Sequence, residues 1–344
     1  MHSYPVTFLH NISMTINPHR RSAVARIAAG LLAIPGFQVL AQAFPAKPIR
    51  IIVPFTPGGS SDVLARAIGV ELGRLLNQAV VVENVPGAGG SLGAEKAARS
   101  TADGYTLLMG HIGTLAINPS LYPKLGYDPV RSFAPVAWIA RVPNLLVVHD
   151  SLPARSLKEL VALAKTRPGQ LAYGSGGNGS AAHTTMEYFK MQTGTSFLHI
   201  PYRGTAPSVT DLLAGQVQML FTGVPALLPH IKAGKIRALA VSSSKRLALL
   251  PDVPTVAESG VAGTKGFEAD QWYGLVAPAG TPPDIVALLN QSVNKALASE
   301  EVRTRLAAEG AEATPPSPQV FSQLIGKEIP RWEKVIKSAQ IKLD

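Results

Sequence analysis

The chain has 344 residues, of which 46% are hydrophobic and 16% are charged, and its formal net charge is +10. This composition excludes the disordered and fibrous classes, and the length allows two domains of ordinary size. The absence of cysteine excludes disulfides, thiolate metal sites and cysteine nucleophiles. The basic residues are scattered and only 6% of residues are aromatic, so no nucleic-acid-binding surface is expected.

The first 43 residues have the order of a secretory signal peptide. They contain no Asp or Glu, carry three arginines, and continue into the apolar run IAAGLLAIPGFQVLAQA, which ends in an A-x-A sequence. We expect cleavage near Ala43/Phe44 and a periplasmic mature protein. Met14 is an alternative start, and the Arg20-Arg21 pair leaves twin-arginine export open beside ordinary export. No later apolar run in the sequence is long enough to span a membrane.

From residue 44 onward, short apolar runs alternate with helical stretches. Most of these runs are continuous in Val, Ile and Leu, which is typical of parallel strands covered on both faces. Glycine precedes several of them, as in ADGYTLLMG and KAGKIRALAV, where a helix would end before the chain turns. The pattern predicts an α/β fold with parallel sheets, divided at this length between two lobes. The predicted strands are 49–55, 80–85, 105–111, 145–149, 171–174, 197–202, 217–222, 236–242 and 272–278.

Three of the predicted strands run into glycine-rich turns that open a helix. Their sequences are PFTPGGSSD, ENVPGAGGSLG and YGSGGNGSAAH. Each turn places backbone N–H groups that lack an intrahelical partner at a helix N-terminus, where the helix dipole favours an anion. A single turn of this kind is more often a plain connection. Three in one chain, two of them rich in serine, indicate an anion site.

Two shorter motif matches compete with this interpretation. Gly174, Gly176 and Gly179 have the G-x-G-x-x-G spacing of a dinucleotide site, but the next predicted strand ends in LHIPYRG, without an acidic residue to bind the ribose. The sequence GGSLG around Ser91 matches the hydrolase motif G-x-S-x-G, but three residues separate it from the preceding strand. An exported α/β serine hydrolase with Ser91 as nucleophile stays as the alternative function. No cofactor is expected, and no metal site, because the histidines lack metal-ligand spacing.

Longer segments carry a resemblance to a known family. FPAKPIRIIVPFTPGGSSDVLAR, VVVENVPGAGGSLGAEKAA, YGSGGNGSAAHTTMEYFK, HIPYRGTAPSVTDLLAGQVQMLF and WYGLVAPAGTPPDIVALLN occur in this order. Together they resemble the Bug-type (TctC-like) extracytoplasmic solute receptors of tripartite tricarboxylate transporters, over essentially the whole chain after the leader. The resemblance implies a monomeric, non-enzymatic, type II-like periplasmic binding protein. Its two α/β lobes would each be a mostly parallel sheet flanked by helices, with the ligand cleft between them.

The same resemblance implies domain limits, a ligand class and a set of binding positions. Residues 1–43 would be the signal peptide, 44–143 plus 268–344 the first lobe, and 144–267 the second. The ligand would be a small organic acid, delivered to membrane permease subunits or to a sensor. Thr222 is a departure, because many relatives carry Asp there, which leaves an amino-acid ligand in doubt. The positions carried over are Phe55, Thr56, Gly58, Gly59, Ser60 and Ser61 in the first-lobe loop, Ser175, Gly176, Gly177, Asn178, Ser180 and His183 in the second-lobe loop, and His111, Thr114, Tyr202, Arg203, Gly204, Thr222 and Gly223 around the rest of the ligand.

Overall fold

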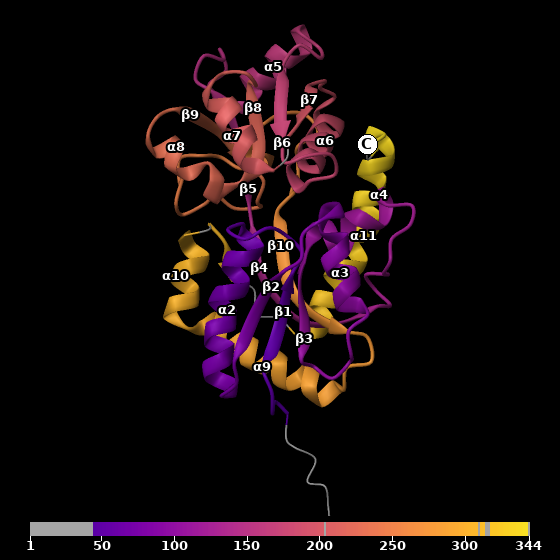
Figure 1. The fold of residues 1–344 in the computed structure, drawn as a ribbon. Coiled ribbons are helices and arrows are strands. Elements are labelled where there is room, and N and C mark those ends of the chain that lie inside the picture. The colour runs from indigo at the N-terminus through magenta and orange to yellow at the C-terminus, as the bar shows by residue number, and fades with distance from the viewer. Residues whose placement is uncertain (1–43, 203, 309, 314–316, 343–344) are drawn as a thin grey trace, which may run out of the picture. The chain divides into compact units, whose positions relative to one another are not determined.

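The computed structural model describes residues 44–202, 204–308, 310–313 and 317–342, which belong to one compact unit (Figure 1). The signal peptide expected over residues 1–43 and the predicted ligand residue Arg203 lie outside the described residues. None of the described helices combines the length and the hydropathy needed to cross a bilayer.

Two mixed sheets form the framework of this unit. The first has the strand order β11-β4-β10-β3-β1-β2, and the second has the order β7-β6-β8-β5-β9. In the first sheet, β1 pairs in parallel with β2 and β3, whereas β10 runs antiparallel to β3 and β4. In the second, β6 pairs in parallel with β7 and β8, whereas β5 runs antiparallel to β8 and β9. The strands are β1 (Ile49–Val53), β2 (Val80–Asn84), β3 (Thr106–His111), β4 (Phe133–Val142), β5 (Asn144–His149), β6 (Ala172–Ser175), β7 (Leu198–Pro201), β8 (Met219–Gly223), β9 (Ile236–Val241), β10 (Gln271–Pro278) and β11 (Glu312–Ala313).

Helices flank both sheets, and the longer ones bury an apolar face. In α2, for example, Leu64, Ile68 and Leu72 recur at helical spacing and are buried, and the helix ends at Asn77 in a left-handed conformation. The helices are α2 (Ser60–Leu76), α3 (Ser91–Ala98), α4 (Asn118–Leu121), α5 (Leu157–Thr166), α6 (Ala181–Thr193), α7 (Thr205–Leu213), α8 (Leu228–Lys232), α9 (Pro283–Ala298), α10 (Glu300–Ala308) and α11 (Pro318–Ala339).

The chain crosses between the two sheets twice. The first crossing is at Pro143, between the end of β4 and the start of β5. The second leads from β9 through residues 242–270 into β10. Figure 1 shows that the upper end of β10 extends beyond the first sheet towards the second. The helix α11 packs on both β4 and α6, so it contacts the two layers as well. The lobe limits 44–143 plus 268–344 and 144–267 stay a prediction.

The two-lobed α/β class predicted from the sequence is confirmed, with differences in detail. Each of the nine predicted strands overlaps a strand of the structure, but β4 and β11 were not predicted. The β4 sequence FAPVAWIARV contains a proline, and its pairing with β10 is interrupted by two register shifts, so it lacks a regular strand pattern. The sheets are mixed because β10 in the first and β5 in the second, the strands that the chain enters after each crossing, run antiparallel to both of their neighbours.

Candidate functional site

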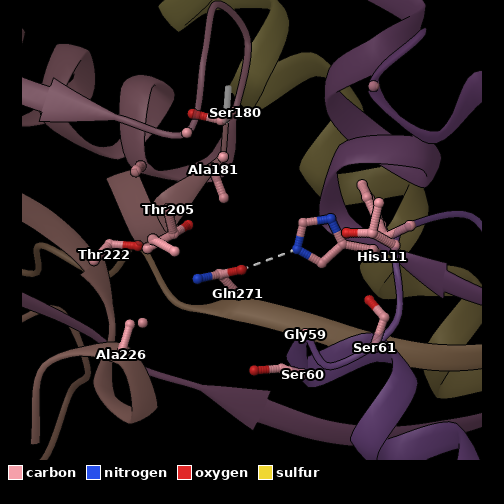
Figure 2. Close-up of a pocket in the computed structure, with 18 of the residues that line it drawn as sticks. Gly59, Ser60, Ser61, His111, Ser180, Ala181, Thr205, Thr222, Ala226 and Gln271 are labelled. Atoms are coloured by element: carbon pink, nitrogen blue, oxygen red, sulfur yellow. Dashed lines mark hydrogen bonds between the residues drawn. The ribbon is translucent and has the colours of Figure 1, made fainter. Parts of the chain in front are cut away.

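A cavity of about 1080 Å³ lies where the N-termini of α2, α6 and α7 meet the start of β10. Figure 2 shows Ser180 and Ala181 on one side of this cavity, Gly59 and Ser60 on the other, and Gln271 between them. Segments that follow strands of both sheets therefore line the same cavity, and the residues that line it are called its wall below. Its lining residues include Phe55, Thr56, Gly58, Gly59, Ser60, Ser61, Gly89, His111, Asn118, Tyr122, Gly176, Asn178, Ser180, Ala181, Gly204, Thr205, Thr210, Thr222, Gly223, Ala226, His230, Gln271 and Tyr273.

The loop before α2 is held in place by Asp62. Gly58 has a φ of +86°, and its N–H donates to Oδ2 of Asp62 at 3.0 Å. The same buried carboxylate accepts hydrogen bonds from Arg66 Nε and Asn84 Nδ2, both at 3.0 Å. Burial acts to raise the pKa of Asp62, but these hydrogen bonds outweigh it and the pKa is lowered. Asp62 therefore shapes the loop as an anion, while the glycine N-cap of α2 leaves the helix end open to the cavity.

The loop before α6 is held from behind by Ser175 and His183. The Gly177 N–H donates to Ser175 Oγ at 3.1 Å, and this hydroxyl also bonds Nε2 of His199 at 2.6 Å. The Gly179 N–H donates to Nδ1 of His183 at 3.1 Å. At the helix start, the Ser180 hydroxyl caps α6 by accepting the N–H of His183 at 3.3 Å. These bonds hold the loop so that Gly176, Asn178, Gly179 and Ser180 line the cavity.

A buried cluster supports this second loop. The rings of His183 and His199 are stacked with centroids 3.8 Å apart, and His199 stacks on Tyr173 at 4.8 Å. The Tyr173 hydroxyl donates to Glu187 Oε1 at 2.6 Å, and Lys190 Nζ donates to the same oxygen at 2.7 Å. Burial, with a smaller effect of Lys190, lowers the pKa of His183 to about 4. His183 is therefore neutral at neutral pH and can accept a hydrogen bond at Nδ1.

Unlike His183 and His199, His111 lines the cavity wall. Its Nδ1 accepts the Gly113 N–H at 3.0 Å, so Nε2 carries the proton and donates to Gln271 Oε1 at 3.1 Å (Figure 2). Burial lowers the pKa of His111 to about 4, which keeps the ring neutral. Thr114 lies behind it, fully buried, and its hydroxyl bonds the His111 backbone.

Comparisons with known proteins identify this arrangement. A model of the tripartite tricarboxylate transporter family receptors matches residues 64–341. The chain belongs to this receptor family. Protein BugT of Bordetella pertussis is 42% identical over 318 residues, which cover 92% of this chain and 96% of BugT.

Solved structures show the same receptor fold. The Rhodopseudomonas palustris protein Rpa4515, solved with adipate, is 42% identical, has a TM-score of 0.79, and is matched over 87% of this chain and 99% of its own. MatC of the same organism, solved with malate, is 36% identical, has a TM-score of 0.76, and is matched over 85% of this chain and 100% of its own.

Most, but not all, of the predicted ligand residues of this receptor line the cavity. Those in the wall are Phe55, Thr56, Gly58, Gly59, Ser60, Ser61, His111, Gly176, Asn178, Ser180, Gly204, Thr222 and Gly223. Five others are not among the residues that line it, and their assignment as ligand residues stays a prediction: Thr114, Ser175, Gly177, His183 and Tyr202. Their polar atoms are engaged within the protein, and in Tyr202 the hydroxyl donates to Asp211 Oδ2 at 2.7 Å.

Sequence reasoning missed several wall residues of the receptor, chiefly Gln271, Tyr273 and Thr205. Gln271 begins β10, but the predicted strand started one residue later, so its side chain was not considered. The sequence pattern that could have identified Gln271 is a polar residue at the start of an otherwise apolar strand. Thr205 begins α7 after the positive-φ residue Gly204, in a turn with one glycine that was too plain to stand out as an anion site.

The described wall residues of the receptor include no Asp, Glu, Lys or Arg. Polar contacts in this wall therefore come from hydroxyls, amides, neutral imidazole and backbone N–H groups. The positive ends of α2, α6 and α7 face the same space, which favours an anion without a paired cationic side chain.

The hydrolase alternative finds no support in this receptor. Ser91 is buried at the first position of α3, with φ and ψ of −63° and −35°, which are ordinary helical values. The strained turn of a nucleophile elbow is therefore not present at this serine. Its Oγ accepts a hydrogen bond from Asn118 Nδ2 at 2.9 Å, an amide that cannot act as a general base.

Proposed function

We propose that this receptor binds a small organic acid as its carboxylate in the cavity and delivers it to the membrane subunits of a tripartite transporter or to a sensor. The observation that carries the proposal is the convergence of three helix N-termini, from both sheets, on a wall whose described residues include no Asp, Glu, Lys or Arg. Adipate and malate in the related structures support the carboxylate class.

The chemistry of the wall suits a carboxylate. The first N–H groups of a helix have no intrahelical acceptor, so an anion at this position receives hydrogen bonds and the helix dipole together. Hydroxyls of Ser60, Ser61 and Ser180 stand at two of these N-termini and can donate to the same oxygens. Hydrogen bonds to a charged acceptor are about twice as strong as neutral ones, so N–H and O–H donors suffice for binding.

The two sheets give the receptor a means of enclosing its ligand. A cavity of about 1080 Å³ is larger than a small diacid requires. Rotation of one sheet layer towards the other about the two crossing segments would bring both sets of helix N-termini onto the ligand. We propose that this closed form, in the periplasm and as a monomer, is what the membrane subunits contact. Binding and closure need no catalytic group, so the receptor acts without enzymatic activity.

A thermal-shift screen tests the ligand class. The full chain is expressed and exported, purified, and then unfolded and refolded to remove any ligand carried through purification. The panel contains mono-, di- and tricarboxylates, acidic amino acids, aromatic acids and nicotinate, with NAD and ATP as controls. A ligand at a hundred times its Kd should stabilise the fold by about 2.7 kcal/mol, which is visible in such a screen. A shift with NAD or ATP alone would contradict the proposal.

A further inference from the structure

The side chain of Gln271 forms hydrogen bonds with residues of both sheets at the cavity wall. Gln271 is the first residue of β10, directly after the second crossing between the sheets, and its side chain lies between the helix N-termini of the two sides (Figure 2). It contacts groups of both sheets: His111 at the end of β3 and Tyr273 of β10 in the first, and Asn144 of β5 in the second.

The orientation of the Gln271 amide is fixed by its neighbours. Its Oε1 accepts the Nε2 proton of His111 and the hydroxyl of Tyr273, both at 3.1 Å. Its Nε2 donates to Oδ1 of Asn144 at 2.8 Å. The Asn144 amide is oriented in turn, because its Nδ2 donates to the Ala269 carbonyl at 2.8 Å. A flipped glutamine amide would place its N–H against the His111 N–H and its oxygen against Asn144 Oδ1, so the nitrogen side is the one kept towards Asn144.

This orientation leaves donor capacity at the cavity. A primary amide nitrogen has two N–H groups, and Asn144 takes one of those on Gln271. The neighbouring wall residue is Gly223, at which an added Cβ would lie 3.2 Å from Nε2 of Gln271. Gly223 approaches the amide nitrogen closely and has no side chain to cover it, and Thr222, Gly223 and Gln271 all line the cavity.

We propose that Gln271 determines the specificity of the receptor: its amide N–H binds a second acceptor of the ligand, remote from the carboxylate at the helix N-termini, and selects against an ammonium group there. The inference rests on the proposed function. An acceptor such as a second carboxylate, a keto oxygen or a hydroxyl oxygen gains a hydrogen bond from the fixed amide. An ammonium group would meet this donor, and no acidic side chain among the described lining residues would pair with it.

Matched ligands and variants test the inference. The ligand sets are succinate with aspartate, glutarate with glutamate, and adipate with 2-aminoadipate and hexanoate, each titrated calorimetrically against the full receptor. Gln271→Glu replaces the donor with a carboxylate oxygen in the wall, and Gln271→Met removes the whole amide, donor and acceptor together, without adding a charge. Gln291→Glu makes the same chemical change on the exposed face of α9 and serves as the control. Circular dichroism and thermal melting establish that each variant is folded.

In the wild type, one diacid should bind at least about tenfold more tightly than the amino acid of the same chain length. Gln271→Glu should raise the Kd of that diacid by about ten- to a hundredfold and lower that of the amino acid, whereas Gln271→Met should only weaken the diacid. If Gln271→Glu does not fold, Gly223→Ala serves as a second variant for the same test. Its added methyl group at 3.2 Å from Nε2 should also weaken the diacid about tenfold, and Gly223 has an ordinary φ of −56°.

Three results would overturn the inference. Folded Gln271 variants with unchanged affinities would show that the amide does not contact the ligand. A wild type that prefers the amino acid, or that binds hexanoate as tightly as adipate, would show that no second acceptor is selected. Both results leave the carboxylate receptor standing. A wild type that binds no acid of any class contradicts the proposed function and the inference with it.

Discussion

The imidazole of His183 holds the backbone of Gly179 through a hydrogen bond of 3.1 Å from the glycine N–H to Nδ1. The ring is buried behind the cavity wall and stacked on His199, so its position is set by packing before any ligand arrives. Only a neutral imidazole has an acceptor at Nδ1. The glycine-rich loop is therefore positioned by a residue that does not line the cavity.

Replacing His183 should weaken ligand binding, although its side chain does not line the cavity. His183→Phe keeps an aromatic ring but removes the acceptor for Gly179, so we expect the Kd of the bound acid to rise about tenfold. His183→Asn provides an amide oxygen near the position of Nδ1 and should restore part of the affinity. Calorimetric titration of the two variants measures this difference. Equal affinities of His183→Phe and the wild type would show that the loop is positioned without this bond.

A carboxylate at the second crossing makes the stability of the receptor depend on pH. Ser242 Oγ donates to Asp270 Oδ1 at 2.5 Å and accepts the Asn144 N–H at 2.8 Å, which links the two crossing segments. Burial, reinforced by Glu268, raises the pKa of Asp270 to about 7 from an ordinary value of 3.8, against the lowering effect of the Ser242 bond. The folded protein thus holds a proton at Asp270 that the unfolded chain has lost.

The free energy of unfolding should therefore contain a contribution from Asp270 that falls as the pH rises from about 4 to about 7. Asp270→Asn cannot ionise, so its stability relative to the wild type should increase through this window. His111 and His183, whose pKa values are lowered to about 4, act in the opposite direction below pH 6.5, but they are present in both proteins. Urea denaturation of both proteins from pH 4 to pH 8 measures the difference. A difference independent of pH would contradict the prediction.

Replacing Asp62 should destabilise the receptor more than replacing its partner Arg66. The carboxylate is buried and is also bonded to Gly58 and Asn84, so Asp62→Ala leaves a backbone N–H and an amide without their acceptor. We expect a loss of about 1–3 kcal/mol in the free energy of unfolding and weaker acid binding. Arg66 is half exposed, so its charge is screened by solvent and Arg66→Ala should lower the free energy of unfolding by less than Asp62→Ala does. Urea titrations measure the free energy of unfolding of the two variants. Similar losses would show that Asp62 stabilises the receptor mainly through its ion pair with Arg66.

The glycine-rich loops were predictable because their signals are local. A continuous apolar strand followed by glycine, serine and a helical pattern occurs within about twenty residues in YGSGGNGSAAHTTMEYFK. Which side chains of a loop face the cavity was not predictable in the same way. Ser175 and Ser180 lie five residues apart in one loop, but Ser175 is paired with His199 and only Ser180 lines the wall. Gln271 depends on contacts more than a hundred residues away in the sequence, which no local pattern records.

Ser91 gives the last prediction, because it separates binding from hydrolysis. Its hydroxyl accepts a hydrogen bond from Asn118 Nδ2, which also donates to the Gly89 carbonyl at 3.0 Å. Ser91→Ala therefore leaves the Asn118 amide with an acceptor and should lower the free energy of unfolding by only about 1 kcal/mol. Its affinity for the acid should match that of the wild type within about twofold, and neither protein should hydrolyse p-nitrophenyl acetate above the buffer rate. Esterase activity that is present in the wild type and lost in Ser91→Ala would establish the serine as a nucleophile and contradict a receptor that acts by binding alone.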